Sequence, residues 1–268
     1  VVAYDHTGGH FATRLWWALR YHGHDRVAVL DGGWNAWVAA GRPVTTDAPD
    51  VPAATFTPRM VPALRAGVDD LAASVDDPGT GAPRIIDARD REQYTGATRR
   101  GPRGGHIPGA VHLPSKALVE ADGRWKSLAA QRAVVEAAGI VPGDPVVAYC
   151  NGGVTATGVL FALHRLGYGD GANYDGSWNE WGERTDLPVE EGVPGQGWVA
   201  PVPQIRPGAS VIRADRARCP GHPDITPDRD RSDVSSRPCS GRGGDVGVRP
   251  VGMVSAGSAA TKEPGDPR

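Results

Sequence analysis

The chain has 268 residues, a formal net charge of −2 and a hydrophobic content of 40%, a composition suited to one or two globular domains. The near-balance of charge argues against a general attraction to nucleic acid or to an anionic membrane, and no apolar run approaches the roughly 18 residues that a membrane span needs. Cys150, Cys219 and Cys239 stand at unrelated spacings and do not form a disulfide framework, so a reducing cytoplasm is the simplest location.

One sequence pattern occurs twice in the chain. Residues 1–5 match residues 146–150, and from Gly8 onward the match continues at a constant offset of 144 positions. It extends to residues 30–37, Leu-Asp-Gly-Gly-Trp-Asn-Ala-Trp, which pair with residues 174–181, Tyr-Asp-Gly-Ser-Trp-Asn-Glu-Trp. A match of this length with a single one-residue length change is not expected by chance. The chain therefore contains two copies of one domain.

Each copy predicts a strand, a tight loop, an amphipathic helix, a second strand and a short helix with two tryptophans. In the second copy, residues 146–149 form the short, β-branched apolar run that a buried parallel strand needs. The helix after the loop carries apolar residues at helical spacing, namely Val159, Leu160, Leu163 and Leu166. Gly167 provides its stop. A strand that alternates with a helix implies an α/β fold, a parallel sheet flanked by helices.

Only the second copy has an upstream half. Residues 84–89 predict a strand that runs into a polar turn, residues 105–114 a turn and another short strand, and residues 129–138 a helix that ends at Gly139. The first copy starts at its central strand, so we expect it to be incomplete and the chain to be truncated at its N-terminus.

These patterns divide the chain into four segments. Residues 1–41 are the expected remnant of the first copy, and residues 61–192 are the complete second copy. Residues 42–60 carry four prolines and form a linker. Residues 193–268 are rich in Pro, Gly, Arg, Asp and Ser without periodicity, and we expect disorder because they cannot bury enough apolar surface. An out-of-frame extension is an alternative origin of this tail.

Cys150 stands at the end of the predicted buried strand, before a glycine-rich loop that leads into a helix. Gly152 and Gly153 allow backbone conformations in which successive N–H groups curl around one centre, and the helix N-terminus adds partial positive charge. Such a loop stabilises an anion at the sulfur, a thiolate or a persulfide, and so predicts a nucleophilic cysteine. The alternative is an ordinary buried core cysteine. The glycine-rich strand-to-helix junction favours the nucleophile.

Residues 149–156, Tyr-Cys-Asn-Gly-Gly-Val-Thr-Ala, and the motif at residues 174–181 resemble the active-site loop and the following motif of thiosulfate and 3-mercaptopyruvate sulfurtransferases, the tandem-domain rhodanese family. The upstream Asp-Ala-Arg and Gly-His-Ile-Pro-Gly-Ala sequences resemble two further motifs of that family. Its N-terminal domain resembles the C-terminal one but lacks the cysteine. Here Asp5 stands where Cys150 stands in the second copy, which fits this arrangement.

The resemblance implies a rhodanese-like fold, with residues 61–192 as the catalytic domain and residues 1–41 as the inactive one. It implies a double displacement, in which thiosulfate or 3-mercaptopyruvate gives sulfane sulfur to Cys150 and cyanide or a thiol removes it. No cofactor, metal, nucleic acid or membrane takes part in that chemistry. The resemblance places persulfide and substrate binding at Asn151, Gly152, Gly153, Val154 and Thr155, and Gln93 stands at the family's position for the donor's anionic group, with Arg99 as a candidate substitute.

The loop does not select one of the two donors. In that family, basic residues after the cysteine accompany thiosulfate and a neutral Gly-Ser-Gly accompanies 3-mercaptopyruvate; here residues 151–153 are neutral but lack the serine. Gln93 stands where the family usually has an arginine for the donor's anionic group. Arg99, with Arg100 and Arg103 in the same loop, is a candidate to replace it, although exposed loop arginines are usually only solvated.

Several other residues have structural interpretations. Asp87 and Arg89 are expected to hold the turn at a strand end as a hydrogen-bonded pair, and His106 to pack and hydrogen-bond within its own turn. Trp178 and Trp181, at helical spacing, are expected in the core.

Further polar side chains have less definite places. The hydroxyl of Thr155 has two compatible uses, donation to the persulfide and capping of the following helix. His6 and His10, in the first-copy loop, face either a cleft between the copies or solvent. Three tail residues with metal-ligating side chains lack zinc-ligand spacing and are assigned no metal: Cys219, His222 and Cys239.

Two other functions fit parts of the pattern. A cysteine phosphatase needs an arginine six positions after its cysteine, and here that position is Ala156, which disfavours phosphoryl chemistry. A catalytically silent sulfur carrier or binding module stays open because of Gln93 and the incomplete first copy. The two differ in turnover, since an enzyme cycles with small donors and acceptors whereas a carrier is loaded by a partner protein.

Overall fold

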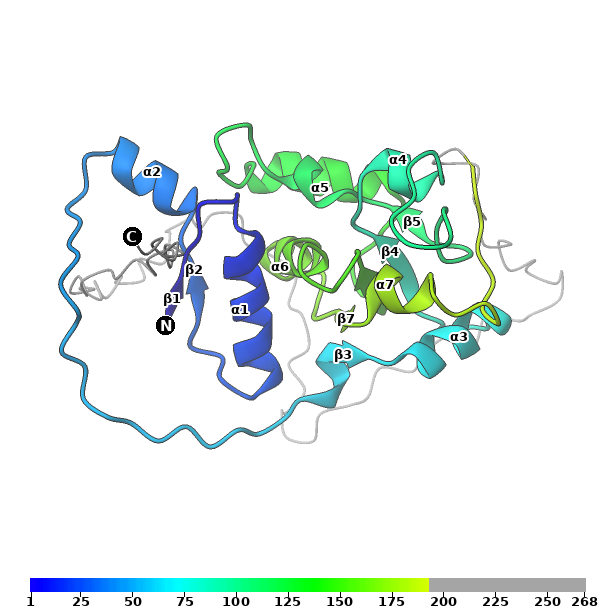
Figure 1. Ribbon diagram of the computed structural model, residues 1–268, viewed down its shortest axis with the longest axis horizontal. Helices are drawn as coiled ribbons and strands as arrows, with labels where there is room; N and C mark the ends of the chain where they lie inside the picture. The colour runs from blue at the N-terminus through cyan, green and yellow to red at the C-terminus, as the bar shows by residue number, and fades with distance from the viewer. Residues whose placement is uncertain (193–268) are drawn as a thin grey trace, which may run out of the picture. The chain divides into compact units, whose positions relative to one another are not determined.

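The computed structural model describes residues 1–192, so the disorder expected for residues 193–268 lies outside the described residues. It contains a five-stranded parallel sheet of order β3-β7-β6-β4-β5 and a separate two-stranded parallel sheet, β1-β2 (Figure 1). The strands are β1 (Val2–Ala3), β2 (Ala28–Val29), β3 (Arg65–Ala66), β4 (Arg84–Asp87), β5 (Val111–His112), β6 (Val146–Tyr149) and β7 (Ala172–Tyr174). The helices are α1 (His10–Tyr21), α2 (Gly33–Ala39), α3 (Val68–Asp76), α4 (Arg91–Tyr94), α5 (Leu128–Ala137), α6 (Ala156–Leu166) and α7 (Ser177–Trp181), with 3₁₀ turns at Pro62–Leu64 and Ser115–Leu118. The α/β fold predicted from the sequence is confirmed.

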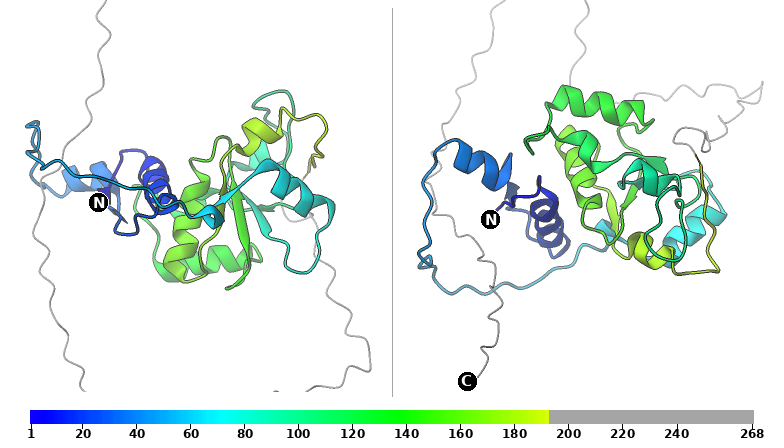
Figure 2. Two further views of the ribbon diagram at one scale, coloured as in Figure 1. Left: turned by 90° about the horizontal axis from the view of Figure 1, so that it is seen from below. Right: turned by 45° about the horizontal axis from the view of Figure 1, so that its top comes forward.

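Helices cover both faces of the five-stranded sheet, because the side chains of its central strands alternate between two hydrophobic clusters. Every residue of β6 is buried; Ala148 points to the cluster with α5 and α6, and Tyr149 to the other. That second face is covered by α3 and α7, whose Leu71 and Trp178 are buried against it. Figures 1 and 2 show the two pairs of helices on opposite sides of the sheet. Burial on both faces explains why β6 is apolar throughout.

The two long helices of the second copy begin and end where local signals place them. The α6 helix is almost entirely buried, and Gly167 ends it in the left-handed conformation at φ 78°. In α5, the Ser127 hydroxyl accepts a hydrogen bond from the Ala130 N–H at 3.2 Å. This cap starts the helix one residue before the predicted position. The helix predicted over residues 129–138 is therefore confirmed with a shift of one residue.

The repeat is visible in the structure, since β1, α1, β2 and α2 of the first copy follow the same order as β6, α6, β7 and α7 of the second. Helices α1 and α6 pack against each other, and the hydroxyl oxygens of Thr13 and Thr157, which are 144 positions apart, lie 3.2 Å from each other. Trp16 of α1 also meets Phe161 of α6 edge to face, with 5.1 Å between ring centroids. The two copies thus share one hydrophobic core.

The segment between the copies, residues 42–60, contains neither helix nor strand, and all its residues are exposed. Its end is tied to the first copy where the Arg59 N–H donates to the His22 carbonyl at 2.9 Å. Within residues 1–192, no helix is long and apolar enough to cross a membrane.

Candidate active site

Three neighbouring strands of the parallel sheet end at the same edge. Asp87 ends β4, Cys150 follows β6, and the turn that leads to Ser177 follows β7. The carboxyl ends of parallel strands are the usual place for a ligand site in an α/β sheet. Cys150 is buried there, with 2% of its surface exposed.

Ser177 holds the two ends of the cysteine loop together. Its Oγ accepts hydrogen bonds from the N–H groups of Cys150, at 3.1 Å, and of Gly153, at 2.9 Å. The same hydroxyl donates to the Tyr174 carbonyl at 2.7 Å. Ser177 has φ 54°, and among residues 1–192 it is the only non-glycine residue with a positive φ. A left-handed residue with a side chain costs about 1–2 kcal/mol. The hydrogen bonds of the Ser177 hydroxyl therefore offset a backbone strain.

The sequence did not single out Ser177, although a signal was available. Its counterpart in the first copy, 144 positions earlier, is Gly33, which has the same φ of 54°. The second copy has serine at a left-handed position where the first copy has glycine, which indicates that the serine hydroxyl has a role that offsets the backbone strain.

The first-copy loop that corresponds to the Cys150 loop holds an anion, because the Asp5 carboxylate lies within it. One oxygen accepts the N–H groups of Thr7 and Gly9, at 2.7 and 2.9 Å, and the other those of Phe11 and Ala12, both at 2.8 Å. Burial alone would raise the pKa of Asp5, but the backbone hydrogen bonds from Ala12, Gly9 and Thr7 outweigh it and lower the pKa. The loop and the helix N-terminus behind it therefore form an anion site.

The corresponding donors of the second copy have no protein acceptor. Thr155 and Ala156 are the counterparts of Phe11 and Ala12, and within residues 1–192 their N–H groups make no hydrogen bond. The N–H of Gly153, counterpart of Gly9, is held by Ser177. The N–H groups of Thr155 and Ala156, beside Cys150, are thus free to bind an anion carried by the sulfur.

The expected helix cap by Thr155 is wrong. Thr155 has helical backbone angles, and its side chain makes no capping hydrogen bond. Thr157, inside the first turn of α6, instead donates its hydroxyl to the Val154 carbonyl at 2.6 Å, a contact that satisfies a carbonyl and caps no backbone N–H. Donation from the Thr155 hydroxyl to a persulfide stays a prediction.

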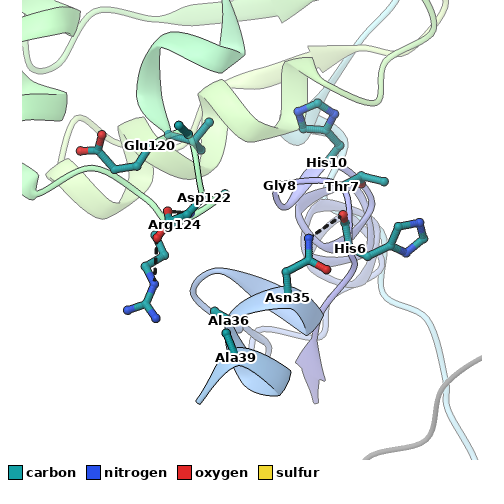
Figure 3. A pocket seen from close by; sticks show the side chains of 13 residues that line it. His6, Thr7, Gly8, His10, Asn35, Ala36, Ala39, Glu120, Asp122 and Arg124 are labelled. Carbon is teal, nitrogen blue, oxygen red and sulfur yellow. Dashed lines mark hydrogen bonds and ion pairs between the residues drawn. The ribbon is translucent and has the colours of Figure 1, made fainter. Parts of the chain in front are cut away.

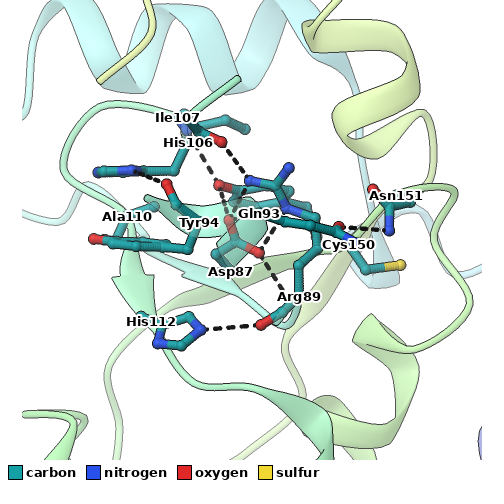
Figure 4. A network of polar contacts seen from close by, with 12 residues as sticks. Asp87, Arg89, Gln93, Tyr94, His106, Ile107, Ala110, His112, Cys150 and Asn151 are labelled. Carbon is teal, nitrogen blue, oxygen red and sulfur yellow. Dashed lines mark hydrogen bonds and ion pairs between the residues drawn. The ribbon is translucent and has the colours of Figure 1, made fainter. Parts of the chain in front are cut away.

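Gln93 lies beside the loop through an amide contact. The Asn151 side-chain N–H donates to the Gln93 Oε1 at 2.9 Å, which joins the loop to α4 (Figure 4). Figure 4 also shows the Cys150 sulfur pointing away from the Asp87–Arg89 pair. Two predicted binding residues, Gln93 and Asn151, are thus neighbours in the structure.

The loop arginines that were candidates to replace the family's arginine at position 93 differ from each other in their surroundings. Arg99 has a side chain that is 63% exposed, and its guanidinium lies 3.8 Å from the Glu191 carboxylate. Arg103 is no candidate, because its guanidinium donates to the main-chain carbonyls of Trp181, Gly182, Arg184 and Leu187. It ties the end of α7 to the segment that follows.

The pair beneath the site has the structural role expected of it. The Arg89 guanidinium lies 2.6 Å from the Asp87 carboxylate, whose other oxygen accepts the Arg89 main-chain N–H at 2.9 Å. The Tyr149 hydroxyl donates to the same carboxylate at 2.7 Å, and the guanidinium stacks 4.3 Å from the Trp178 ring centroid. Burial raises the pKa of Tyr149 well above its ordinary value, so this hydroxyl stays protonated and acts as a donor.

His106 is also a packing residue, as expected. Its Nδ1 lies 2.8 Å from the Tyr94 carbonyl, and its ring stacks on Tyr94 with centroids 3.8 Å apart. Burial lowers the pKa of His106, which keeps the ring neutral at neutral pH. Trp178 and Trp181 are buried in the core, at 1% and 0% exposure, as predicted.

A cavity of about 580 Å³ lies elsewhere, between the first-copy loop, α2 and residues 119–124. His6 and His10 line it, and His6 is also exposed, so both expected surroundings, the cleft and solvent, apply to that histidine. Figure 3 shows the His6 ring and the Arg124 guanidinium pointing to opposite sides of the cavity. Asp122 and Arg124 pair with each other at 3.4 Å, and residues 1–192 contain no group of three or more His, Cys, Asp or Glu side chains that could hold a metal ion.

The family model described as rhodanese-like domain matches residues 1–40 and 68–184, one stretch in each copy. The chain belongs to the rhodanese-like family.

Curated relatives of this rhodanese-like chain include both carriers and transferases. It is 34% identical over 202 residues to the sulfur carrier protein TtuD of Thermus thermophilus, covering 72% of this chain and 71% of that protein. It is 36% identical over 201 residues to a putative thiosulfate sulfurtransferase of Haloferax volcanii, covering 72% and 69%. It is 35% identical over 194 residues to the 3-mercaptopyruvate sulfurtransferase of Escherichia coli K12, covering 71% and 67%.

Solved structures with the same fold include EanB with a cysteine persulfide, in a tetrahedral intermediate state with ergothioneine. The TM-score is 0.63 at 24% identity, and the match covers 72% of this chain and 52% of that one. The chain therefore spans about half the length of EanB, and at this identity the likeness shows the fold alone.

Proposed function

We propose that the chain is a sulfurtransferase in which Cys150 carries sulfane sulfur as a persulfide. Membership of the rhodanese-like family supports this, together with relatives named thiosulfate and 3-mercaptopyruvate sulfurtransferases at 33–36% identity. Residues 61–192 are the catalytic copy, residues 1–41 the inactive copy and residues 42–60 the linker between them.

The observation that carries the proposal is the Asp5 carboxylate in the first-copy loop. The Oδ atoms of an aspartate and the outer sulfur of a cysteine persulfide are separated from Cα by the same number of bonds. Asp5 therefore shows where the loop holds an anionic atom at that distance, namely among the backbone N–H groups at the helix N-terminus. Beside Cys150, the free N–H groups of Thr155 and Ala156 offer the same place to an outer sulfur.

The chemistry is a double displacement whose atoms and charges balance. The Cys150 thiolate attacks the sulfane sulfur of the donor, a new S–S bond forms, and the donor's bond to that sulfur breaks with its electron pair leaving on sulfite or on the pyruvate enolate. Cyanide or a thiolate then attacks the outer sulfur, and the Cys150 thiolate leaves. Backbone donors that are already in place stabilise the anionic sulfur in both steps without reorganisation.

The burial of Cys150 supports small reactants. Only 2% of the residue is exposed, and Asn151 and Gly153 on either side of Gly152 are tied to Gln93 and Ser177. A small donor or acceptor reaches such a sulfur with less movement of the loop than a protein partner needs. We therefore propose thiosulfate or 3-mercaptopyruvate as donor and cyanide or a small thiol as acceptor. The amides of Gln93 and Asn151 lie at the entrance, and Arg99 is the outer contact for the donor's anionic group.

Intact-mass spectrometry tests the proposal. The protein is incubated with thiosulfate or with 3-mercaptopyruvate, and then with cyanide, in parallel with Cys150→Ser. We expect the wild type to gain the mass of one sulfur atom and to lose it to cyanide as thiocyanate, while the variant stays unchanged. The donor that loads the protein identifies the subclass. A folded wild type that gains no sulfur from either donor contradicts the enzyme.

A second candidate, a sulfur carrier, is favoured by the relative named sulfur carrier protein TtuD. A carrier is loaded once by another protein and releases its sulfur to a partner, whereas the enzyme produces many thiocyanate molecules per chain. Thiocyanate formation over time with excess donor and cyanide separates the two.

A further inference from the structure

An arginine of the first copy reaches the cysteine loop of the second. Arg14, on α1, donates from Nη1 to the Gly153 carbonyl at 3.1 Å and to the Asp175 carboxylate at 2.5 Å. Its guanidinium also lies over the Trp17 ring, 4.5 Å from the centroid. Asn173 donates to the same carbonyl at 3.2 Å.

The Gly153 carbonyl needs donors from outside its own helix. In the first copy, the corresponding carbonyl of Gly9 accepts both the N–H and the hydroxyl of Thr13, at 2.9 and 2.8 Å, as the first turn of α1. In the second copy, the N–H and the hydroxyl of Thr157 turn to Val154 instead, at 3.2 and 2.6 Å. This difference leaves the Gly153 carbonyl outside the helix and free to be held by Arg14.

Fixing this carbonyl fixes the direction of the next N–H. The Gly153 carbonyl and the Val154 N–H belong to one trans peptide, and they point in opposite directions. With the carbonyl held toward α1, the Val154 N–H points away from α1, and within residues 1–192 it has no acceptor. Arg14 and Asn173 therefore together hold the orientation of a free donor in the loop that contains Cys150, and Arg14 is the contribution of the first copy.

We propose that Arg14 is a positioning residue for the Cys150 loop, contributed by the inactive copy. This inference rests on the proposed function, since the loop matters through the sulfur that it holds. Arg14 acts by geometry rather than by its charge, because Asp175 neutralises that charge and 29% of the Arg14 side chain is exposed. The position is specific to the first copy, as its counterpart in α6 is Gly158.

The same helix offers a matched control. Arg20 also crosses from α1 to an aspartate of the second copy, Asp170, with two hydrogen bonds at 2.9 and 2.8 Å. It also lies over a tryptophan ring, that of Trp16, at 4.9 Å. Arg20→Ala thus removes an equivalent contact between the copies without touching the Cys150 loop.

The experiment compares Arg14→Ala, Arg14→Lys and Arg20→Ala in the full chain by two measurements. The first is the rate of sulfur gain by intact mass with the donor that loads the wild type. The second is the pH dependence of Cys150 alkylation by iodoacetamide, which reports thiolate formation without any sulfur transfer.

We expect Arg14→Ala to slow sulfur gain by about tenfold or more, because a displacement of about 1 Å in a site is costly. It should also raise the midpoint of alkylation, as the thiolate loses an oriented donor. Arg14→Lys, which keeps one donor to the carbonyl, should restore part of both, and Arg20→Ala should lower only the melting temperature.

Equal effects of the two alanine variants, or no effect of Arg14→Ala, would overturn the positioning role. If Arg14→Ala does not fold, Arg14→Lys against Arg20→Ala decides in the same way. A wild type that gains no sulfur refutes the proposed function. The alkylation midpoints of the wild type and the Arg14 variants then still test whether Arg14 positions the Cys150 loop.

Discussion

At the scale of single residues, Ser177 combines a favourable hydroxyl with an unfavourable backbone. The hydroxyl satisfies the buried N–H groups of Cys150 and Gly153, while φ 54° strains any residue with a side chain. Ser177→Gly removes both features, and Ser177→Ala removes only the hydroxyl. Unsatisfied buried donors cost roughly 1–3 kcal/mol each, and relief of the left-handed strain returns about 1–2 kcal/mol.

We therefore expect Ser177→Ala to be clearly destabilised and Ser177→Gly to lie closer to the wild type in urea unfolding. Both variants should gain sulfur more slowly, by about tenfold or more, because the loop loses the hydrogen bonds from Cys150 and Gly153 to the Ser177 hydroxyl. If Ser177→Gly transfers sulfur at the wild-type rate, the hydroxyl has only a structural role.

Asp5 gives a prediction for the pH dependence of stability. The pKa of Asp5 is lowered in the folded protein, so its ionised form stabilises the fold above its unfolded pKa of about 3.9. This contribution is lost as the pH falls through the lower folded pKa. Asp5→Asn keeps the shape but places an amide N–H₂ against backbone donors, and we expect a loss of roughly 1–2 kcal/mol at pH 7.

The difference in unfolding free energy between wild type and Asp5→Asn should shrink steadily as the pH is lowered below 4. Urea unfolding at several pH values measures it. A difference that is constant from pH 7 to pH 3 would mean that the carboxylate charge does not stabilise the first-copy loop.

At the scale of loops and helices, two glycines with similar backbone angles differ in their surroundings. Gly153 has φ 70°, and a Cβ there would lie 2.8 Å from the Asp175 carboxylate and 2.9 Å from its carbonyl. Gly167 has φ 78° and open space around the same position. Alanine strains the backbone at both sites, by about 1–2 kcal/mol, but it meets other atoms only at Gly153.

We expect Gly153→Ala to reduce sulfur gain by at least about tenfold, because Asp175 must move and release Arg14. Gly167→Ala should lower the unfolding free energy by about 1–2 kcal/mol and leave sulfur gain unchanged. Equal activity of the two variants would show that the loop tolerates a change of shape at Gly153.

The elements differ in how well they can be predicted from the sequence. The β6 strand, the α6 helix and the stop at Gly167 follow from local patterns, and the structure confirms them. The short strand predicted within residues 105–114 is confirmed as β5, whereas β3 has two residues, too few for a period to be read. The loop around Cys150 was predicted from its glycines, whereas Arg14 and Ser177 reach it from 136 and 27 positions away, as the sequence numbers show. No local pattern records such contacts.

At the scale of the whole described chain, the first copy depends on the second. Its sheet consists of two strands of two residues each, which cannot form a stable core alone. Its α1 helix instead buries Trp16 and Trp17 against the second copy, with the Trp17 indole N–H donating to the Leu64 carbonyl at 2.8 Å. The two copies should therefore unfold together.

The last prediction tests this cooperativity with two tryptophans of the first copy. Trp16 is 5% exposed and packs on Phe161 of the second copy, whereas the Trp37 indole N–H, in α2, donates to the carbonyl of Pro43 in the linker. Trp16→Ala should cost about 3–5 kcal/mol, and the whole chain should unfold earlier in one transition. Trp37→Ala should change the unfolding free energy by less than half as much.

Urea unfolding followed by far-UV circular dichroism and by tryptophan fluorescence measures both variants. Coincident transitions in the wild type indicate a single cooperative unit. If the wild type shows two transitions and Trp16→Ala shifts only the smaller one, the copies fold independently. In that case Arg14 could not hold the Cys150 loop through conditions that unfold the first copy, and sulfur transfer should be lost with the first transition rather than the second.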